Sequence, residues 1–306
     1  MLRRGRCTTP QSALHHRRDK VVKEKWLVIS NCQTLGLANC LALLCPHADV
    51  DMCDIWLFQS GADTWRTKIL EYDQLIINPE IQGLGLVDFS TLRNVIWVPA
   101  LSFRAFHPDL QNVFHAGQSV KTPMDDYHSV IIFAAYKLGL DEKDTAALFR
   151  RDVYEDLGFF SIWDDEKRGL LTSFAKYGLD VRPEFVKWMR QGPFMHSMNH
   201  PKIHALYDLA VKVACKIPGA VVVRTDFAPQ DNLIAASVYP VYPEIADRYG
   251  VGRGSKVFKV AYSYKVLSLE EFISGSFFAY RSFEAEDLQG NSPHFDRAIQ
   301  LIMAAA

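Results

Sequence analysis

Residues 26–36 read WLVISNCQTLG, an apolar run that passes through Asn-Cys-Gln into a second apolar stretch. The run at 26–30 is typical of a buried β-strand, and residues 35–44 have the dense apolar content of a buried helix. Another apolar run, residues 53–58, follows at the distance that a βαβ crossover needs. This part of the chain therefore predicts an α/β fold that begins with a right-handed βαβ unit.

Two further strands and a series of helices are expected downstream. Residues 74–77 and 94–98 are short apolar runs that extend the sheet. Beyond Pro123 the pattern becomes helical, with Ser268 and Glu271 forming a capping box. The other predicted helices are residues 125–138, 141–151, 203–217, 243–250 and a longer segment reaching towards 177. The predicted fold class is α/β, with a small, mainly parallel N-terminal sheet embedded in a principally helical chain.

The composition is that of a globular protein with an unusual first segment. Of the 306 residues 49% are hydrophobic and 23% are charged, which is enough to build a full core. Residues 1–25 carry eight basic and two acidic side chains, so their net charge is +6 and the remainder is −7, because the total is −1. A mildly acidic body lacks the broad basic face that binds nucleic acid. We expect a basic, disordered leader at 1–25, a small α/β subdomain at 26–120 and a mainly helical region at 121–306.

The leader contains no apolar segment of secretory-signal length, and no stretch of the sequence is long enough for a transmembrane helix. We therefore expect a cytoplasmic protein. The six cysteines include four within residues 32–53, but they form no CxxC pair and have no histidine at zinc-finger spacing. No metal is expected, and the cysteines are predicted to be reduced.

Cys32 is the strongest catalytic candidate, because it lies where the first strand ends and the first helix begins. Ligands of open α/β sheets bind outside the carboxyl ends of the strands. The positive end of the helix would lower the pKa of Cys32 below the roughly 8.5 of a free cysteine. Asn31 and Gln33 add amide donors that could hold an acyl oxyanion beside the sulfur. The alternative is a small buried residue between a helix cap and a first-turn residue.

His200 is the candidate general base. The proline that follows keeps it out of helical geometry, so it belongs to a loop or a helix entrance. A loop imidazole with a pKa near 6.5 suits proton transfer at neutral pH. His196 and His204 lie close by in the sequence, but no carboxylate is spaced between His200 and His204 as in an HExxH metal site. A structural role for these histidines is the alternative.

Two further segments carry weaker candidates. His107 precedes a proline after the predicted strand at 94–98, and Arg104 beside it could meet a phosphate or a carboxylate. A surface turn with an Arg–Asp pair is the alternative for that segment. Tyr239 and Tyr242 stand in a proline-stiffened loop, where their rings could stack on an adenine or a sugar. Packing in the core or in a turn is the alternative for the tyrosines.

Three common signatures are missing from the chain. No GxGxxG motif opens a helix after a strand, and no GxxxxGK[ST] motif occurs. The GxSxG elbow of serine hydrolases is also absent. Dinucleotide binding and P-loop nucleotide binding therefore lose their usual support.

Four separated motifs follow one another along the chain. They are Asn31-Cys32-Gln33 after a strand, Phe106-His107-Pro108-Asp109, Asn199-His200-Pro201 before a helix, and Tyr239-Pro240-Val241-Tyr242-Pro243-Glu244. In this order, and in a chain of this length, they resemble the WcbI-like family of polysaccharide-biosynthesis acetyltransferases. The resemblance runs from about residue 26 to about residue 250 and leaves the leader outside.

The resemblance implies a cradle-like, largely helical protein with a deep pocket for coenzyme A. The implied activity is O-acetylation of a sugar in capsule or exopolysaccharide assembly, with acetyl-CoA as the co-substrate. The implied partners are a sugar or polysaccharide-precursor acceptor and other capsule-assembly proteins. The implied location is cytoplasmic, either free or peripheral to an inner-membrane assembly complex.

On this resemblance the reaction centre would be Cys32, with His200 first and His107 second as the base that deprotonates the sugar hydroxyl. The positioning residues would be Asn31, Gln33 and Asn199, and the coenzyme contacts Arg104, Tyr239 and Tyr242. Either Cys32 is transiently acetylated, or it lines an oxyanion site for direct transfer.

Two other classes of protein stay open. An SGNH-type esterase would also combine a strand-end nucleophile with a late loop histidine, although Ser197 occupies the position three residues before His200 where that class has an aspartate. A non-catalytic accessory protein would bind coenzyme A or a sugar without turnover.

Overall fold

The computed structural model describes residues 23–305, so most of the predicted leader lies outside the described residues. The first strand already begins at Glu24. Four parallel strands form a sheet in the order β2-β1-β3-β4. Their bounds are β1 Glu24–Ser30, β2 Ala48–Asp54, β3 Gln74–Ile77 and β4 Val95–Trp97. The predicted α/β class with a small parallel sheet near the N-terminus is confirmed.

The central strand β1 is buried on both faces, which is why it reads as a continuous apolar run. Trp26 and Val28 face the side covered by helix α1 (Thr34–Leu44), whereas Leu27 and Ile29 face a second, smaller core. All four side chains are inaccessible to solvent. This alternation anchors the strand whose end carries Cys32.

The predicted strand at residues 53–58 is wrong in its position. The strand β2 ends at Asp54, and a short helix, α2 (Ile55–Ser60), begins immediately after it. Asp54 caps this helix, because its carboxylate accepts a hydrogen bond of 2.8 Å from the Leu57 amide. The apolar run therefore spans two elements, and a helix α3 (Ala62–Lys68) follows.

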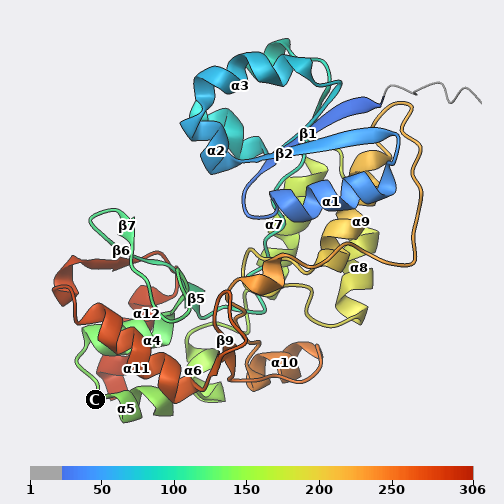
Figure 1. Cartoon of the computed structure of the whole chain (residues 1–306). Coiled ribbons are helices and arrows are strands. Elements are labelled where there is room, and N and C mark those ends of the chain that lie inside the picture. The colour runs from blue at the N-terminus through green and yellow to red at the C-terminus, as the bar shows by residue number, and fades with distance from the viewer. Residues whose placement is uncertain (1–22, 306) are drawn as a thin grey trace, which may run out of the picture.

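Three later helices complete the core beneath the sheet (Figure 1). They are α7 (Trp163–Ala175), α8 (Arg182–Arg190) and α9 (Ile203–Ala214). Helix α9 approaches α1 so closely that a Cβ atom on Gly36 would lie 2.6 Å from Leu206 Cδ1. One hydrophobic core thus joins residues on both sides of the predicted boundary at residue 120.

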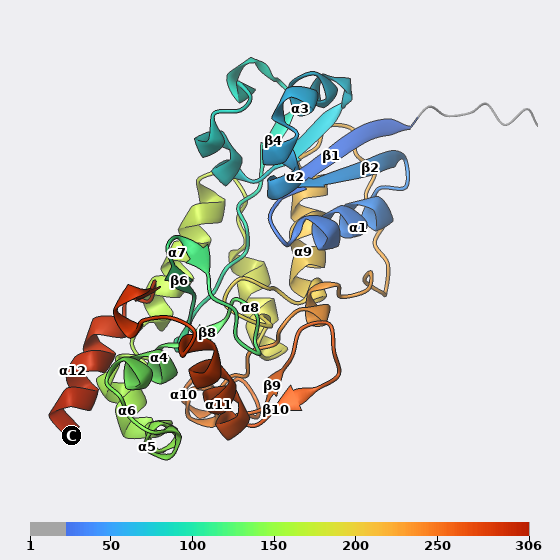
Figure 2. The same ribbon diagram turned by 60° about the vertical axis from the view of Figure 1, so that its left-hand side comes forward.

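The remaining helices gather in a second region with its own core (Figure 2). They are α4 Val130–Lys137, α5 Glu142–Ala147, α6 Arg151–Asp156, α10 Pro243–Tyr249, α11 Leu269–Tyr280 and α12 Phe295–Ala305. Short strands connect them: β5 Leu110–Gln111, β6 Val113–His115, β7 Gln118–Ser119, β8 His128–Ser129, β9 Phe258–Lys259, β10 Val266–Leu267 and β11 Leu288–Gly290.

Local helix signals were reliable in this region. The capping box of Ser268 and Glu271 is formed, Asp141 caps α5, and Gly250 ends α10 in the left-handed conformation with φ 63°. The predicted helix at 125–138 begins later, at Val130, since β8 precedes it. The predicted helix at 141–151 is shorter and ends at Ala147.

Candidate functional site

The sheet order places two loops side by side at the carboxyl ends of the strands. Strands β1 and β3 are neighbours in the sheet. The chain after β1 packs on one face and the chain after β3 on the other. Ligands of open α/β sheets bind in the crevice that such a divergence creates at the carboxyl ends of the strands. Asn31, Cys32 and Gln33 follow β1, and Asn78 follows β3. The Asn78 amide donates to the Ile29 carbonyl at 2.8 Å, so the two loops start in contact.

Cys32 is half-buried in this crevice. Its Sγ lies 3.7 Å from Asn31 Oδ1 and 4.0 Å from the carbonyl oxygen of Asn199. Burial raises the pKa of the thiol to about 11, hydrogen bonding to backbone lowers it only partly, and the nearby Glu80 carboxylate raises it further. The predicted lowering of this pKa by the helix end is therefore wrong, and the thiol is protonated at neutral pH.

Gln33 ties the Cys32 loop to two distant segments. Its Nε2 donates to the carbonyls of Leu101, at 2.8 Å, and Asn199, at 3.0 Å, and its Oε1 accepts from the Leu101 amide at 2.9 Å. Asn31 Oδ1 accepts from the Gln33 amide at 3.2 Å. Gln33 thus holds the loop in place. Its role as an oxyanion donor stays a prediction, and it would require Gln33 Nε2 to release one of these two carbonyls.

His200 lies beside this loop and contacts Tyr127. The Tyr127 hydroxyl is 3.2 Å from His200 Nδ1 and 3.4 Å from Nε2, and it also bonds Asn199 Oδ1 and Ser197 Oγ, each at 2.7 Å. Burial lowers the pKa of His200 to about 4. The expected pKa near 6.5 is therefore wrong: the imidazole is neutral at pH 7 and is a weaker base than a free histidine. Asn199 joins the cluster to the thiol, because its carbonyl oxygen faces Cys32 and its amide group faces Tyr127.

The loop that carries His200 is fixed by a hydrogen bond between His196 and Asp231. His196 Nε2 lies 2.9 Å from Asp231 Oδ2, which also accepts from the Ile203 amide at the start of α9 at 3.0 Å. Burial alone would raise the pKa of Asp231, but these hydrogen bonds lower it on balance. Asp231 therefore positions the segment and does not touch His200.

His107 lies in a different environment from His200. It is 1% exposed, and neither of its ring nitrogens has a hydrogen-bond partner among the described residues. Burial lowers its pKa to about 3. Its predicted role as a second base stays a prediction, but the ring is sealed within the protein rather than displayed at the sheet end.

Tyr239 and Tyr242 are buried, so the alternative of core packing describes their positions. Both hydroxyls donate to Asp109 Oδ2, at 3.0 and 2.7 Å, and the Ile131 amide at the start of α4 donates to Oδ1 at 3.1 Å. Burial raises the pKa of Asp109 to about 6, although these bonds lower it in part. Coenzyme stacking by the two rings would require them to leave this network, and it stays untested.

Arg104 is partly buried against the protein backbone. Its guanidinium donates to the Leu110 carbonyl at 3.0 Å, and its own amide donates to Glu166 Oε2 at 2.7 Å. Burial lowers its pKa, and the nearby Glu166 carboxylate raises it in part. The guanidinium forms no salt bridge with another described residue, and its predicted contact with the coenzyme stays a prediction.

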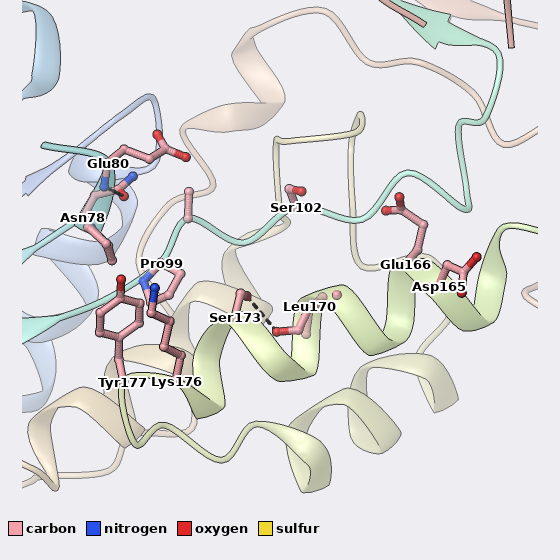
Figure 3. A pocket seen from close by; sticks show the side chains of 13 residues that line it. Asn78, Glu80, Pro99, Ser102, Asp165, Glu166, Leu170, Ser173, Lys176 and Tyr177 are labelled. Carbon is pink, nitrogen blue, oxygen red and sulfur yellow. Dashed lines mark hydrogen bonds between the residues drawn. The ribbon is translucent and has the colours of Figure 1, made fainter. Parts of the chain in front are cut away.

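A cavity of about 410 Å³ lies at the carboxyl ends of β3 and β4. The ends of β3 and β4 form one wall, and helix α7 forms the other (Figure 3). Asn78 and Glu80 stand at one end, and Asp165 and Glu166 stand at the other. Sequence reasoning missed these residues and Tyr127, because only the fold brings them to the sheet end.

Within residues 23–305 no group of three or more His, Cys, Asp or Glu side chains is placed to hold a metal ion. The described cysteines are free thiols. None of the helices in the same range combines the length and apolarity needed to cross a bilayer.

Comparisons with known proteins agree on one family. A family model described as polysaccharide biosynthesis enzyme WcbI matches residues 25–218, which include Cys32, His107 and His200. A solved structure of WcbI, described as the native protein without a disulfide bond between coenzyme A and one of its cysteines, superposes with a TM-score of 0.62. It is 16% identical and covers 91% of this chain and 96% of its own, so the likeness concerns the fold. No curated protein sequence matches the chain significantly.

Proposed function

The chain belongs to the WcbI family of polysaccharide biosynthesis enzymes, and from that premise we propose that it is a coenzyme A-dependent O-acetyltransferase. Its acceptor would be a sugar hydroxyl in capsular or exopolysaccharide biosynthesis. The observation that carries the proposal is the joining of Cys32, Asn199, Tyr127 and His200 into one cluster at the carboxyl end of β1. Such a cluster offers a neutral base beside a site where an acyl group could lie.

We propose direct transfer with His200 as the base. The sugar hydroxyl gives its proton to the neutral imidazole, the hydroxyl oxygen bonds to the thioester carbonyl carbon, and the carbon–sulfur bond breaks. The proton then passes to the departing thiolate of coenzyme A. Direct transfer is favoured over an acetylated Cys32, because a thiol with a pKa of about 11 is a weak nucleophile at neutral pH.

Cys32 would then position the acyl group rather than carry it. The description of the solved WcbI structure names coenzyme A together with one of that protein's cysteines. Cys32 is therefore the first place in this chain to look for the thiol end of the coenzyme. Arg104 is the candidate for a coenzyme phosphate, since its guanidinium is not paired with a carboxylate among residues 23–305.

The first test is calorimetric titration with coenzyme A and acetyl-CoA, followed by acetyl-transfer assays. Saturable binding of both ligands and release of coenzyme A only with a sugar present would support the proposal. On the direct route Cys32→Ala should retain turnover within about ten-fold, whereas a covalent route predicts complete loss. Absence of binding at about 1 mM ligand would overturn the proposal.

The same assays separate the two other classes. An esterase would release acetate from an acetylated glycan without coenzyme A, and an accessory protein would bind without turnover. The contacts of His200 weigh against an esterase triad. Its ring contacts the Tyr127 hydroxyl, whereas the Asp231 carboxylate bonds His196. A cytoplasmic location, with or without peripheral contact to an assembly complex at the inner membrane, is part of the proposal.

A further inference from the structure

The cavity between the strand ends and α7, termed here the α7 pocket, contains an unused hydrogen-bond donor. Asn78 lines this pocket and is 1% exposed, and its Nδ2 has no partner among the described residues. Its Oδ1 is occupied, because it accepts from the Glu80 amide at 3.0 Å and caps the turn that follows β3. Buried amide groups are rarely left unpaired, so a donor of this kind points to a bound group that accepts a hydrogen bond.

The charge of the α7 pocket disfavours the phosphate groups of coenzyme A. Glu80, Asp165 and Glu166 contribute carboxylates to the lining, against the single ammonium of Lys176. Asp165 is partly offset by an ion pair of 3.1 Å with Arg168, and Glu166 by the nearby Arg104, but Glu80 forms no salt bridge within residues 23–305. Phosphate groups would be repelled here, whereas hydroxyl and ammonium groups would find acceptors.

The size and walls of the α7 pocket also suit a sugar. Its volume of about 410 Å³ lies in the range of small-molecule sites. Tyr177 adds an aromatic ring at the Asn78 end, as Figure 3 shows, and Ser102 and Ser173 add hydroxyl groups. A site rich in hydrogen-bonding groups with one aromatic ring matches the surface of a pyranose.

The pocket adjoins the reaction centre. Asn78 follows β3 directly, and its backbone amide bonds the strand that leads into Cys32. Glu80 lies close enough to Cys32 to act on its thiol electrostatically. A molecule in the pocket would therefore have one end beside the place where the acyl group would be transferred.

We propose that the α7 pocket is the acceptor subsite, that it takes a neutral or amino sugar, and that Asn78 Nδ2 donates a hydrogen bond to one oxygen of that sugar. That the bound sugar acts as an acetyl acceptor depends on the transferase function proposed above. The binding site itself rests on the unused amide and on the charge of the lining. Acidic and phosphorylated sugars are excluded as preferred acceptors.

The test follows the Asn78 side-chain amide by ¹H–¹⁵N NMR on the full chain. Asn78→Asp keeps the capping oxygen and removes the amide, which identifies the resonance. Glucose and glucosamine at about 50 mM should shift this resonance, and glucuronic acid should shift it less. Asn78→Asp should weaken glucose binding about five- to ten-fold. Asn94→Asp is the matched control, because Asn94 precedes β4 at the amino end of the strand, whereas the pocket lies at the carboxyl end, and it should leave sugar binding unchanged.

A second variant tests the pocket independently, in case Asn78→Asp does not fold. A Cβ on Gly169 in α7 would meet no atom within 4 Å, although the residue lines the pocket. Gly169→Phe should fill the pocket and abolish the sugar-induced shift, while Gly169→Ala should preserve it. The proposal is overturned if coenzyme A moves the Asn78 resonance and no sugar does, if glucuronic acid binds most tightly, or if Gly169→Phe leaves sugar binding intact.

These outcomes are distinct from failure of the proposed function. Sugar binding at Asn78 without acetyl transfer would leave the subsite standing and remove the transferase. Acetyl transfer to a sugar that does not disturb Asn78 would remove the subsite and leave the transferase standing.

Discussion

Two loop segments of the molecule each place a histidine before a proline, yet their surroundings differ. His200 lies beside the Cys32 loop, with its ring against the Tyr127 hydroxyl. His107 is enclosed by neighbours such as Phe106 and Tyr239, and its ring nitrogens have no hydrogen-bond partners among the described residues. Both imidazoles are neutral at pH 7, because burial lowers both pKa values.

The difference shows that a proline fixes the backbone of the preceding residue but not the burial of its side chain. The backbone restriction acts between adjacent residues. Burial depends on which distant elements pack over the segment. We therefore expect changes at His200 to affect turnover and changes at His107 to affect stability.

The largest expected effect is the loss of turnover in His200→Ala. Removing a general base costs about 10²- to 10⁴-fold in rate, and the free energy of unfolding should change little. Steady-state acetyl transfer and urea unfolding would measure the two quantities. His204→Ala, a change in the first turn of α9, is the matched control and should keep most of the turnover. Equal loss in both variants would contradict the role of His200 as the base.

The next effect is a loss of stability in acid. His107, His128 and His200 have folded pKa values of about 3, 4 and 4, against 6.5 for an unperturbed histidine. The unfolded chain therefore binds more protons between about pH 4 and 6.5, and stability falls as the pH falls through this window, by about 1.4 kcal/mol per pH unit for each extra proton.

Asp109 acts in the opposite direction in part of this window. Its folded pKa of about 6 lies above the unperturbed 3.8, so protonation of the folded form partly offsets the loss. Urea unfolding at several pH values would give the net slope. His107→Phe should reduce that slope by about one proton. A slope of zero or of opposite sign would show that these histidines are accessible to protons in the folded state.

A smaller effect is expected from Tyr127→Phe. The variant keeps the ring but removes the hydroxyl that bonds Ser197, Asn199 and His200. Turnover should fall about ten-fold, with little change in the KM for acetyl-CoA, because in the proposed mechanism Tyr127 positions the base. The pH profile of kcat should also shift. A change confined to KM would assign Tyr127 to binding instead.

The smallest effect is a gain in stability for His107→Phe at neutral pH. An apolar ring of similar size removes two buried, unpaired nitrogens, so the free energy of unfolding should rise by about 1 kcal/mol. Turnover should stay unchanged, which is the reverse of the expectation for His200→Ala. Loss of turnover without loss of stability would restore His107 as a catalytic candidate.

Sequence reasoning succeeded where the determining contacts are local. The capping box of Ser268 and the ends of α10 depend on residues a few positions apart, and the structure reproduces them. The position of Cys32 at a strand end follows from one apolar run. Residues 53–58 were misassigned because the Asp54 cap divides a run that looks continuous in sequence.

The composition of the site could be predicted only in part. Cys32 and His200 could be named as candidates because a thiol and an imidazole are reactive groups that can be recognised in sequence, and their catalytic roles stay predictions. Tyr127 and Asn78 were missed, since their roles depend on contacts with residues far along the chain. The pKa of Cys32 was misjudged for the same reason, because its burial comes from segments that no local pattern reveals.

The closure of the sheet core by α9 has a consequence for biosynthesis. Strand β4 ends at Trp97, but α9, which covers α1, is complete only at Ala214. At the usual rate of translation the ribosome needs on the order of ten seconds to cover that interval. During this time the nascent sheet would display an uncovered apolar face, so we expect its early folding to depend on a chaperone at the ribosome exit.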